Sequence, residues 1–258
     1  MPEDPIYHIQ VGQKDIGKYV ILPGDRGRVE RIAKYLDQAK PVASNREYYT
    51  MTGYLQGEKV SVMSTGMGAP CITIAVEELR TLGVHTYIRI GTAGGLQPAL
   101  TRLGDGIIPT GAIRDDGTTA RYIPEIYPAI AHPDVVNALR QAAKTKHERV
   151  HHGIVLSTDA YYARNFNIEE TRQLMDLFIR GNALCVEMEV SGLFVLGTLF
   201  GLRCGAILTI REESNDKGEY THQAGDLYEQ GLERSIQTTI EAIRLLIETD
   251  RRNEPSSA

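Results

Sequence analysis

Short, continuously apolar segments alternate along the chain with longer amphipathic stretches. The apolar segments are too uniformly hydrophobic for a sheet with one face in water, so they predict strands that are covered on both faces. We expect these strands at residues 19–22, 60–64, 86–90, 106–110, 153–156, 185–190 and 204–210. The amphipathic stretches predict helices at residues 28–36, 72–82, 134–144, 169–180, 191–200 and 227–248.

Helices follow strands from one end of the chain to the other. This alternation predicts an α/β protein, folded as a three-layer α/β/α sandwich around a central mixed β-sheet. The sequence contains no linker, internal repeat or low-complexity segment. We therefore expect a single domain over residues 1–252, followed by a small, polar and frayed tail at residues 253–258.

Composition limits the classes of partner. The 258 residues are 42% hydrophobic and 24% charged, as in a globular protein with a sizeable core. The net charge is −5 and no basic cluster stands out, so we expect no nucleic acid or membrane partner. The N-terminus lacks the pattern of a signal peptide, and a cytoplasmic protein is expected. Cys71, Cys185 and Cys204 are widely spaced in apolar segments and are interpreted as core thiols, a reactive thiol being the alternative.

Polar residues gather where predicted strands end and the next helices begin, which is where α/β sheets bind ligands. At the first junction, Gly24 can bring a backbone N–H close to an anion, and Arg28 can add a charged donor. A turn with solvated arginines is the alternative. At the second junction, Arg89 lies inside an apolar strand. A guanidinium there needs an anionic ligand or a structural ion pair with an acid elsewhere. Thr92 adds a hydroxyl beside the glycines that follow.

Two further junctions carry carboxylates and aromatic rings. Alternation places Glu187 and Glu189 on one face of a strand and Met188 on the other. An apolar helix follows at once, so these acids are expected near the core, where they need hydrogen-bond donors such as the vicinal hydroxyls of a sugar. Acids on an edge strand facing water are the alternative. Tyr161 or Tyr162 can stack on a flat ring, or can serve as a core or lid residue.

In order and spacing these segments resemble the nucleoside phosphorylase-I family, and its uridine-cleaving members in particular. The resemblance runs from about residue 8 to residue 214. It rests on His8, Pro23-Gly24-Asp25 with Arg28, Ser44-Asn45-Arg46-Glu47, Ser64-Thr65-Gly66-Met67-Gly68, Arg89-Ile90-Gly91-Thr92, Thr158-Asp159 and Glu187-Met188-Glu189. It implies a pentosyltransferase that uses inorganic phosphate to split a nucleoside, with uridine as the expected substrate, into free base and ribose 1-phosphate. Phosphate is then a co-substrate, and no cofactor is expected.

The resemblance also implies the residues of two subsites and a role for a second subunit. Phosphate would be bound by Gly24, Arg28, Arg46, Arg89 and Thr92, and ribose by His8, Thr92, Glu187, Met188 and Glu189. Among these, Arg28, Arg89 and Glu189 are expected to carry catalysis. Arg46 and His8 would come from the neighbouring subunit, so a homodimer is the expected minimal active unit, and dimers can stack into a homohexamer.

Recognition of the base departs from the family pattern. Tyr161 aligns with the aromatic residue that stacks on the base. Uridine-cleaving bacterial relatives carry a Gln-x-Arg pair a few residues later, where this chain has Asn165-Phe166-Asn167 preceded by Arg164. Purine-cleaving relatives place an aspartate where Arg211 stands. The expected base contacts are therefore Tyr161, Arg164, Asn165, Asn167 and Arg211.

The same residues are also compatible with two other functions. One is a purine nucleoside phosphorylase, or a nucleosidase of the same fold. Hydrolysis is disfavoured, because water needs no cradle of arginines. The other is a nucleoside-binding protein without activity. Some relatives hold potassium with a glutamate in the place of Glu47, but Cys71 replaces its serine partner. No metal is expected.

Overall fold

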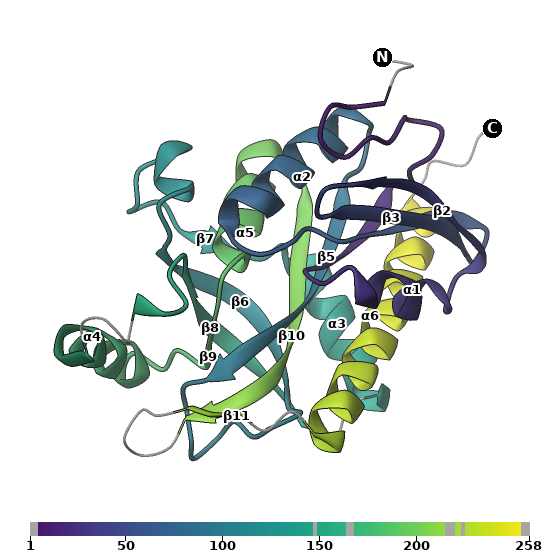
Figure 1. The fold of residues 1–258 in the computed structure, drawn as a ribbon. Helices are drawn as coiled ribbons and strands as arrows, with labels where there is room; N and C mark the ends of the chain where they lie inside the picture. Colours follow the sequence, from purple (N-terminus) through teal and green to yellow (C-terminus); the bar gives the residue numbers. More distant parts are fainter. Residues whose placement is uncertain (1–4, 147–148, 164–167, 215–219, 223–224, 254–258) are drawn as a thin grey trace.

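The computed structural model describes residues 5–146, 149–163, 168–214, 220–222 and 225–253 (Figure 1). Strands and helices alternate along the chain, as the sequence predicts. The strands are β1 (Tyr19–Pro23), β2 (Asp37–Asn45), β3 (Tyr48–Leu55), β4 (Glu58–Met63), β5 (Thr86–Gly95), β6 (Gly106–Asp115), β7 (Ala129–Ile130), β8 (Val150–Thr158), β9 (Cys185–Glu187), β10 (Arg203–Ser214) and β11 (Tyr220–His222). The helices are α1 (Gly27–Ala33), α2 (Ala69–Thr81), α3 (Pro133–Lys146), α4 (Ile168–Arg180), α5 (Val190–Phe200) and α6 (Asp226–Asn253), with a short 3-10 turn η1 at Thr119–Arg121.

All these strands belong to one mixed sheet, in the order β11-β10-β6-β8-β9-β5-β1-β4-β3-β2, with β7 beside β6. Strand β10 also pairs with β5, so β10, β6, β8, β9 and β5 close into a ring. Strands β1 and β4 extend the sheet from this ring in parallel with β5, and β3 and β2 follow antiparallel. The expected mixed sheet is confirmed, and the ring is a feature that the apolar pattern does not reveal.

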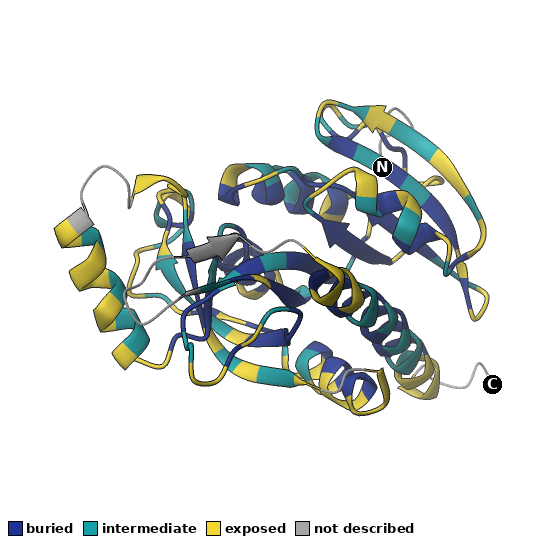
Figure 2. Cartoon of the chain, turned by 60° about the horizontal axis from the view of Figure 1, so that its bottom comes forward, coloured by how far each residue is buried: buried dark blue, intermediate teal, exposed yellow. Residues whose placement is uncertain are grey.

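Helices cover both faces of the sheet, which confirms the three-layer α/β/α arrangement. On one face α2 and α5 bury residues such as Ile72 and Phe194. On the other face α1, α3 and α6 bury residues such as Ile32, Leu139 and Ile243. The peripheral helix α4 packs on a smaller separate cluster, and its described side chains are exposed or half-buried (Figure 2). None of the described helices has both the length and the apolar character needed to cross a membrane.

The sheet divides along one edge of β5. Residues 86–90 of β5 pair with β1, whereas Gly94 and Gly95 pair with β9. Between them, residues 91–93 have no ladder partner on that edge among the described strands. Because β1 ends at Pro23, this division opens at the carboxyl ends of parallel strands, where α/β sheets bind ligands.

Several boundaries differ from the expected ones. Strand β5 continues past residue 90 to Gly95, because β10 pairs with its glycine-rich end. The strand expected over residues 185–190 stops at Glu187, and Glu189 instead takes the N-cap position of α5. The hairpin of β2 and β3 was not expected, because β2 is a largely exposed edge strand without an apolar run. Helix α6 reaches Asn253, the first residue of the expected tail.

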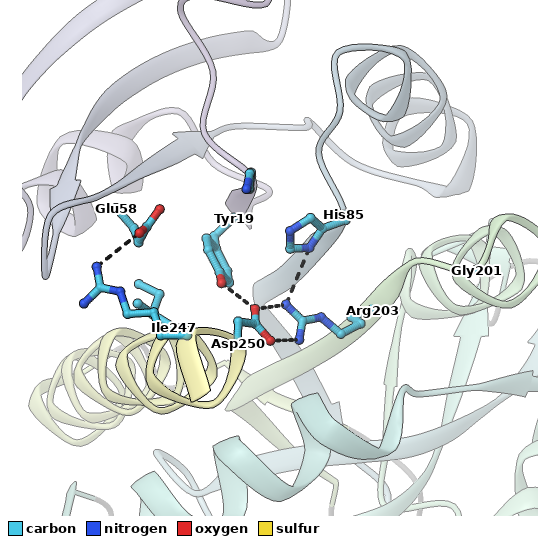
Figure 3. A pocket seen from close by; sticks show the side chains of 9 residues that line it. Tyr19, Glu58, His85, Gly201, Arg203, Ile247 and Asp250 are labelled. Carbon is cyan, nitrogen blue, oxygen red and sulfur yellow. Dashed lines mark hydrogen bonds and ion pairs between the residues drawn. The ribbon is translucent and has the colours of Figure 1, made fainter. Parts of the chain in front are cut away.

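At the opposite, amino-terminal edge of β1, β5 and β10, a pocket of about 360 Å³ contains a cluster of polar contacts. Arg203 donates through Nη1 and Nη2 to the Asp250 carboxylate at 2.6 and 2.5 Å and through Nε to the Thr86 hydroxyl at 3.0 Å. The Tyr19 hydroxyl donates to the same carboxylate at 2.5 Å. Figure 3 shows Tyr19 and Arg203 pointing at Asp250, with His85 beside Arg203. Asp250 thus ties the end of α6 to β1 directly and, through Arg203, to β10 and β5.

We predict that Asp250→Asn lowers the free energy of unfolding by about 1–3 kcal/mol at pH 7, because charge-assisted hydrogen bonds to half-buried partners are lost. Burial alone raises the pKa of Asp250, but the bonds from Arg203 and Tyr19 outweigh it and hold the pKa below its ordinary value. A carboxyl whose pKa is lower in the folded than in the unfolded protein stabilises the fold at any pH above its unfolded-state pKa. That contribution is lost as the pH falls through the folded-state pKa. In denaturant unfolding, the free energy of unfolding of Asp250→Asn should therefore be lower than that of the wild type by a constant amount from pH 6 to 8. This deficit should shrink below about pH 4.

Glu58→Gln is the matched control. Glu58 lines the same pocket and pairs with Arg251 at 3.1 Å, but both side chains are exposed. Such a pair contributes about 0–1 kcal/mol. Equal losses for the two variants, or a deficit of Asp250→Asn that is as large at pH 3 as at pH 7, would contradict the role given to Asp250.

Candidate active site

The buried guanidinium of Arg89 lies at the division of the sheet. Arg89 is 4% exposed on β5, and its Nη2 donates to Oε2 of Glu189. Its Nε lies 3.6 Å from Oε2 of Glu187, and both Nε and Nη1 are buried with no hydrogen-bond partner among the described residues. A buried donor left unsatisfied costs about 1–3 kcal/mol. The site therefore holds a cation whose spare donors suit an anion with several acceptor oxygens.

Two glycines leave space around this guanidinium. A Cβ atom on Gly91 would lie 3.2 Å from Nε and Nη2 of Arg89 and 2.6 Å from Cδ2 of Leu208. A Cβ atom on Gly24, just after β1, would lie 3.7 Å from Nη1 of Arg89 and 3.1 Å from the Gly66 carbonyl oxygen. Gly91 therefore lets the guanidinium fold against β5, and Gly24 exposes the backbone beside its unpaired nitrogen.

The two carboxylates are buried and well supplied with donors. Glu189 accepts the backbone N–H of Gly68, the N-cap of α2, at 2.6 Å. Glu187 accepts the Ser157 hydroxyl at 2.5 Å and the N–H groups of Glu189 and Val190 at 2.9 Å each. Burial, and then the charge of Glu189, raise the pKa of Glu187 to about 7. The expectation that both acids lie near the core is confirmed, and the alternative of acids facing water is wrong. Met188 between them is half-buried.

Arg28 and Arg211 converge on Tyr228 of α6. Arg28 donates through Nη2 to the Tyr228 hydroxyl at 3.2 Å, and the Arg211 guanidinium lies over the Tyr228 ring, 5.5 Å from its centroid. Burial lowers the pKa of Arg28; Tyr228 and Asp25 oppose that shift, and the positive charges of Arg89 and Arg211 add to it. Three guanidinium groups therefore share one electrostatic environment, which favours an anion among them. Thr92 is half-buried on β5, opposite Thr209 of β10.

At the expected base end, Tyr161 follows β8 and is partly exposed. Its hydroxyl donates to Oε1 of Glu212 at 2.9 Å, and its ring meets Tyr162 edge to face at 4.9 Å. Three of the predicted base contacts, Arg164, Asn165 and Asn167, lie outside the described residues.

His8 lies away from this centre, whereas the backbone carbonyl of Arg46 accepts a hydrogen bond from Nη1 of Arg26, in the loop after β1, at 2.6 Å. The Nδ1 atom of His8 is 2.5 Å from the Glu78 carboxylate, and the Asn45 side chain donates to the His8 carbonyl at 2.8 Å. Glu78 lies ten residues past Gly68, about 15 Å along α2. Arg46 is exposed at the turn between β2 and β3, with a φ of 51°. Within one chain, therefore, His8 does not join the carboxylates of the centre.

Glu47, the possible cation position, lies beside Cys71. Burial, and then the negative charge of Glu47, raise the pKa of the Cys71 thiol. No group of three or more His, Cys, Asp or Glu side chains in the described part of the chain is arranged to hold a metal ion. Cys185 and Cys204 are buried, as expected, and Cys71 is partly exposed.

Comparison with known proteins gives the family. Residues 18–248 match the sequence model of the Phosphorylase superfamily. The chain belongs to this superfamily. It is similar to the uridine phosphorylase of Treponema pallidum, with 41% identity over 249 residues that cover 95% of each chain. It is also 37% identical to the guanosine phosphorylase of Halorubrum lacusprofundi over 93% of this chain and 98% of that one. The crystal structure of uridine phosphorylase from Vibrio fischeri superposes with a TM-score of 0.83 at 31% identity, covering 95% and 98% of the two chains.

Within this phosphorylase fold, sequence reasoning missed several contributors. Tyr228 accepts a hydrogen bond from Arg28 and has the Arg211 guanidinium over its ring. It lies in the first turns of α6, where an aromatic residue gives no signal of a site. Gly68 was noted in a motif, but its bond to Glu189 spans 121 residues. Ser157 follows the apolar run of β8 and so reads as an ordinary strand end. Only the tertiary pairing reveals these roles.

We predict that Arg89→Lys lowers kcat/KM for phosphate by about 10²–10³-fold, because a lysine keeps the charge beside Glu189 but loses the spare donors of the guanidinium. Alanine is the poorer test, since it leaves two buried carboxylates without their cation. Steady-state kinetics at varied phosphate would measure the loss, with the unfolding midpoint as the check on folding. Unchanged phosphate kinetics in a folded Arg89→Lys protein would remove Arg89 from the phosphate site.

Proposed function

We propose that this phosphorylase cleaves uridine with inorganic phosphate to give uracil and ribose 1-phosphate. The observation that carries the proposal is the buried Arg89, whose Nε and Nη1 have no hydrogen-bond acceptor in the described part of the chain, with Nη1 beside Gly24 and Arg28 in the same surroundings. Guanosine is the second candidate substrate, because the similar protein of Halorubrum lacusprofundi is a guanosine phosphorylase. Phosphate acts as a co-substrate, and the reaction uses no cofactor.

The residues of the centre would divide the reaction between them. Arg89, Arg28, Gly24 and Thr92 would hold phosphate against C1′ of the ribose, an effect of proximity and charge. Phosphate is itself the nucleophile, so no side chain needs to attack the sugar. Its oxygen forms the new bond to C1′ as the bond to the base nitrogen breaks, and the base leaves with the electron pair.

The buried acids would hold the sugar. Glu189 and Glu187 would accept hydrogen bonds from the ribose hydroxyls, with Met188 against the ring. Positive charge develops on the sugar as the glycosidic bond breaks, and carboxylates close to it stabilise that charge. A hydrolase has no use for spare arginine donors beside the sugar carboxylates, which favours phosphorolysis over cleavage by water.

The arrangement of His8 and Arg46 supports a site shared between subunits. His8 is about 15 Å along α2 from the carboxylates of its own chain, and the Arg46 side chain is exposed at the turn between β2 and β3. We expect them to complete the site of a partner subunit, so that a homodimer is the minimal active unit and dimers can stack into a homohexamer. We also expect the enzyme to work in the cytoplasm.

The direct test is release of free base from uridine, thymidine, guanosine, inosine, adenosine and cytidine, each with and without phosphate. We expect uracil release from uridine that depends on phosphate and yields one ribose 1-phosphate for each uracil. Base release at the same rate without phosphate would show a nucleosidase. Failure to cleave any of these nucleosides would favour a binding protein.

A hybrid dimer tests the shared site. Arg28→Ala and Arg46→Ala should each be nearly inactive, but a hybrid of the two chains contains one intact site. The purified hybrid, isolated through two different tags, should regain about half of the wild-type activity. A hybrid of wild-type chains carrying the same tags is the control. An inactive mutant hybrid beside an active control would place Arg46 outside the partner's site.

A further inference from the structure

Strand β10 has a β-bulge after Ile210, where a cation, Arg211, is followed directly by a carboxylate, Glu212. In the register with β5, Ile210 lies opposite Ala93 and Glu212 opposite Gly94, so Arg211 is an extra residue. A bulge of this kind re-aims the side chains around it and is common beside active sites. Arg211 lies over Tyr228, on the side of the arginine cluster, whereas Glu212 meets Tyr161. The bulge therefore directs opposite charges to opposite ends of the site.

The Glu212 carboxylate is a hydrogen-bond acceptor held at the hydroxyl edge of the Tyr161 ring, which is accessible to solvent. Glu212 is 9% exposed, whereas Tyr161, whose hydroxyl donates to its Oε1, is 39% exposed. An ionised carboxylate can accept hydrogen bonds from several donors at once. A flat ring stacked on Tyr161 would thus present its edge to a fixed acceptor.

The register of the ring of strands places this acceptor across from the sugar carboxylates. Gly94 of β5 lies opposite Glu212 on one side and opposite Val186, the neighbour of Glu187, on the other. Adjacent strands are about 5 Å apart, so the backbones of Glu212 and Val186 are separated by roughly 10 Å. Gly94 places no side chain between them. This separation suits a ligand that has hydroxyls at one end and a flat ring at the other.

We propose that Glu212 reads the base by accepting the ring N–H that lies beside a carbonyl, which is N3–H in uracil and N1–H in guanine or hypoxanthine. Tyr161 is the positioning residue that holds the carboxylate. The inference rests on the proposed function and names its substrate class, nucleosides of oxo bases. Cytosine and adenine carry an acceptor nitrogen at these positions, and an ionised carboxylate cannot donate to it. Uridine and guanosine, the two substrates that the names of the relatives suggest, both belong to the class.

The leaving base gains negative charge, which a carboxylate on its own opposes. The hydrogen bond that the ring N–H donates offsets part of this repulsion. An analogue that lacks the ring N–H would bring a methyl group or a ring lone pair against the carboxylate, and a site built to bind an N–H group discriminates strongly against such an analogue.

The test compares uridine with 3-methyluridine, in which the N3–H is replaced by a methyl group. Calorimetric binding without phosphate measures the affinity ratio independently of turnover. We expect the wild type to prefer uridine by on the order of 100-fold or more, and Glu212→Ala to reduce this ratio to below about tenfold. Tyr161→Phe, which keeps the ring but loses the hydroxyl, should give an intermediate ratio. A preference that survives in Glu212→Ala, or is absent from the wild type, would overturn the proposal.

A second variant makes the test independent of damage to the fold. Glu212→Gln gives the side chain an N–H donor for N3 of cytosine, so the ratio of cytidine to uridine affinity should rise by about tenfold or more. An unchanged ratio would also overturn the role of Glu212. Loss of phosphate-dependent cleavage in the wild type, with the binding preference intact, would instead refute the proposed function and leave base reading by Glu212 standing.

Discussion

A guanidinium buried beside two carboxylates is the contact on which the centre of this fold depends. Arg89 on β5 meets Glu189 at the start of α5, and Glu189 in turn accepts the N–H at the start of α2. One strand and two helices therefore converge through a single side chain. Bringing these charges out of water is costly, and the cost is repaid only where the hydrogen bonds are complete.

Both acids accept hydrogen bonds from the protein, whereas two nitrogens of the arginine find no acceptor among the described residues. Glu187 accepts hydrogen bonds from a hydroxyl and two backbone N–H groups, while Nε and Nη1 of Arg89 donate no hydrogen bond to any described residue. This asymmetry gives the site its polarity, with sugar-binding acceptors on one side and anion-binding donors on the other. The division of the sheet at β5 provides the space, since Gly24 and Gly91 place no side chain against the guanidinium.

The sequence was informative wherever chemistry lies within a few residues of an apolar run. An arginine inside a strand admits two interpretations, an ion pair or an anion site, and the structure shows the ion pair while leaving donors for an anion. The sequence did not predict contacts that join distant segments of the chain. Tyr228 and Glu212 lie in unremarkable patterns, and their partners are 200 and 51 residues away. The division at β5 also escapes prediction, because its cause is the pairing of one glycine-rich strand with three neighbours.

The most direct measurement is a crystal structure of the protein with inorganic phosphate, or with arsenate for stronger scattering. We expect an anion beside Gly24 with one oxygen within hydrogen-bond distance of Nη1 of Arg89 and another facing Arg28. An anion bound elsewhere, with Nη1 covered by another part of the protein, would contradict this expectation.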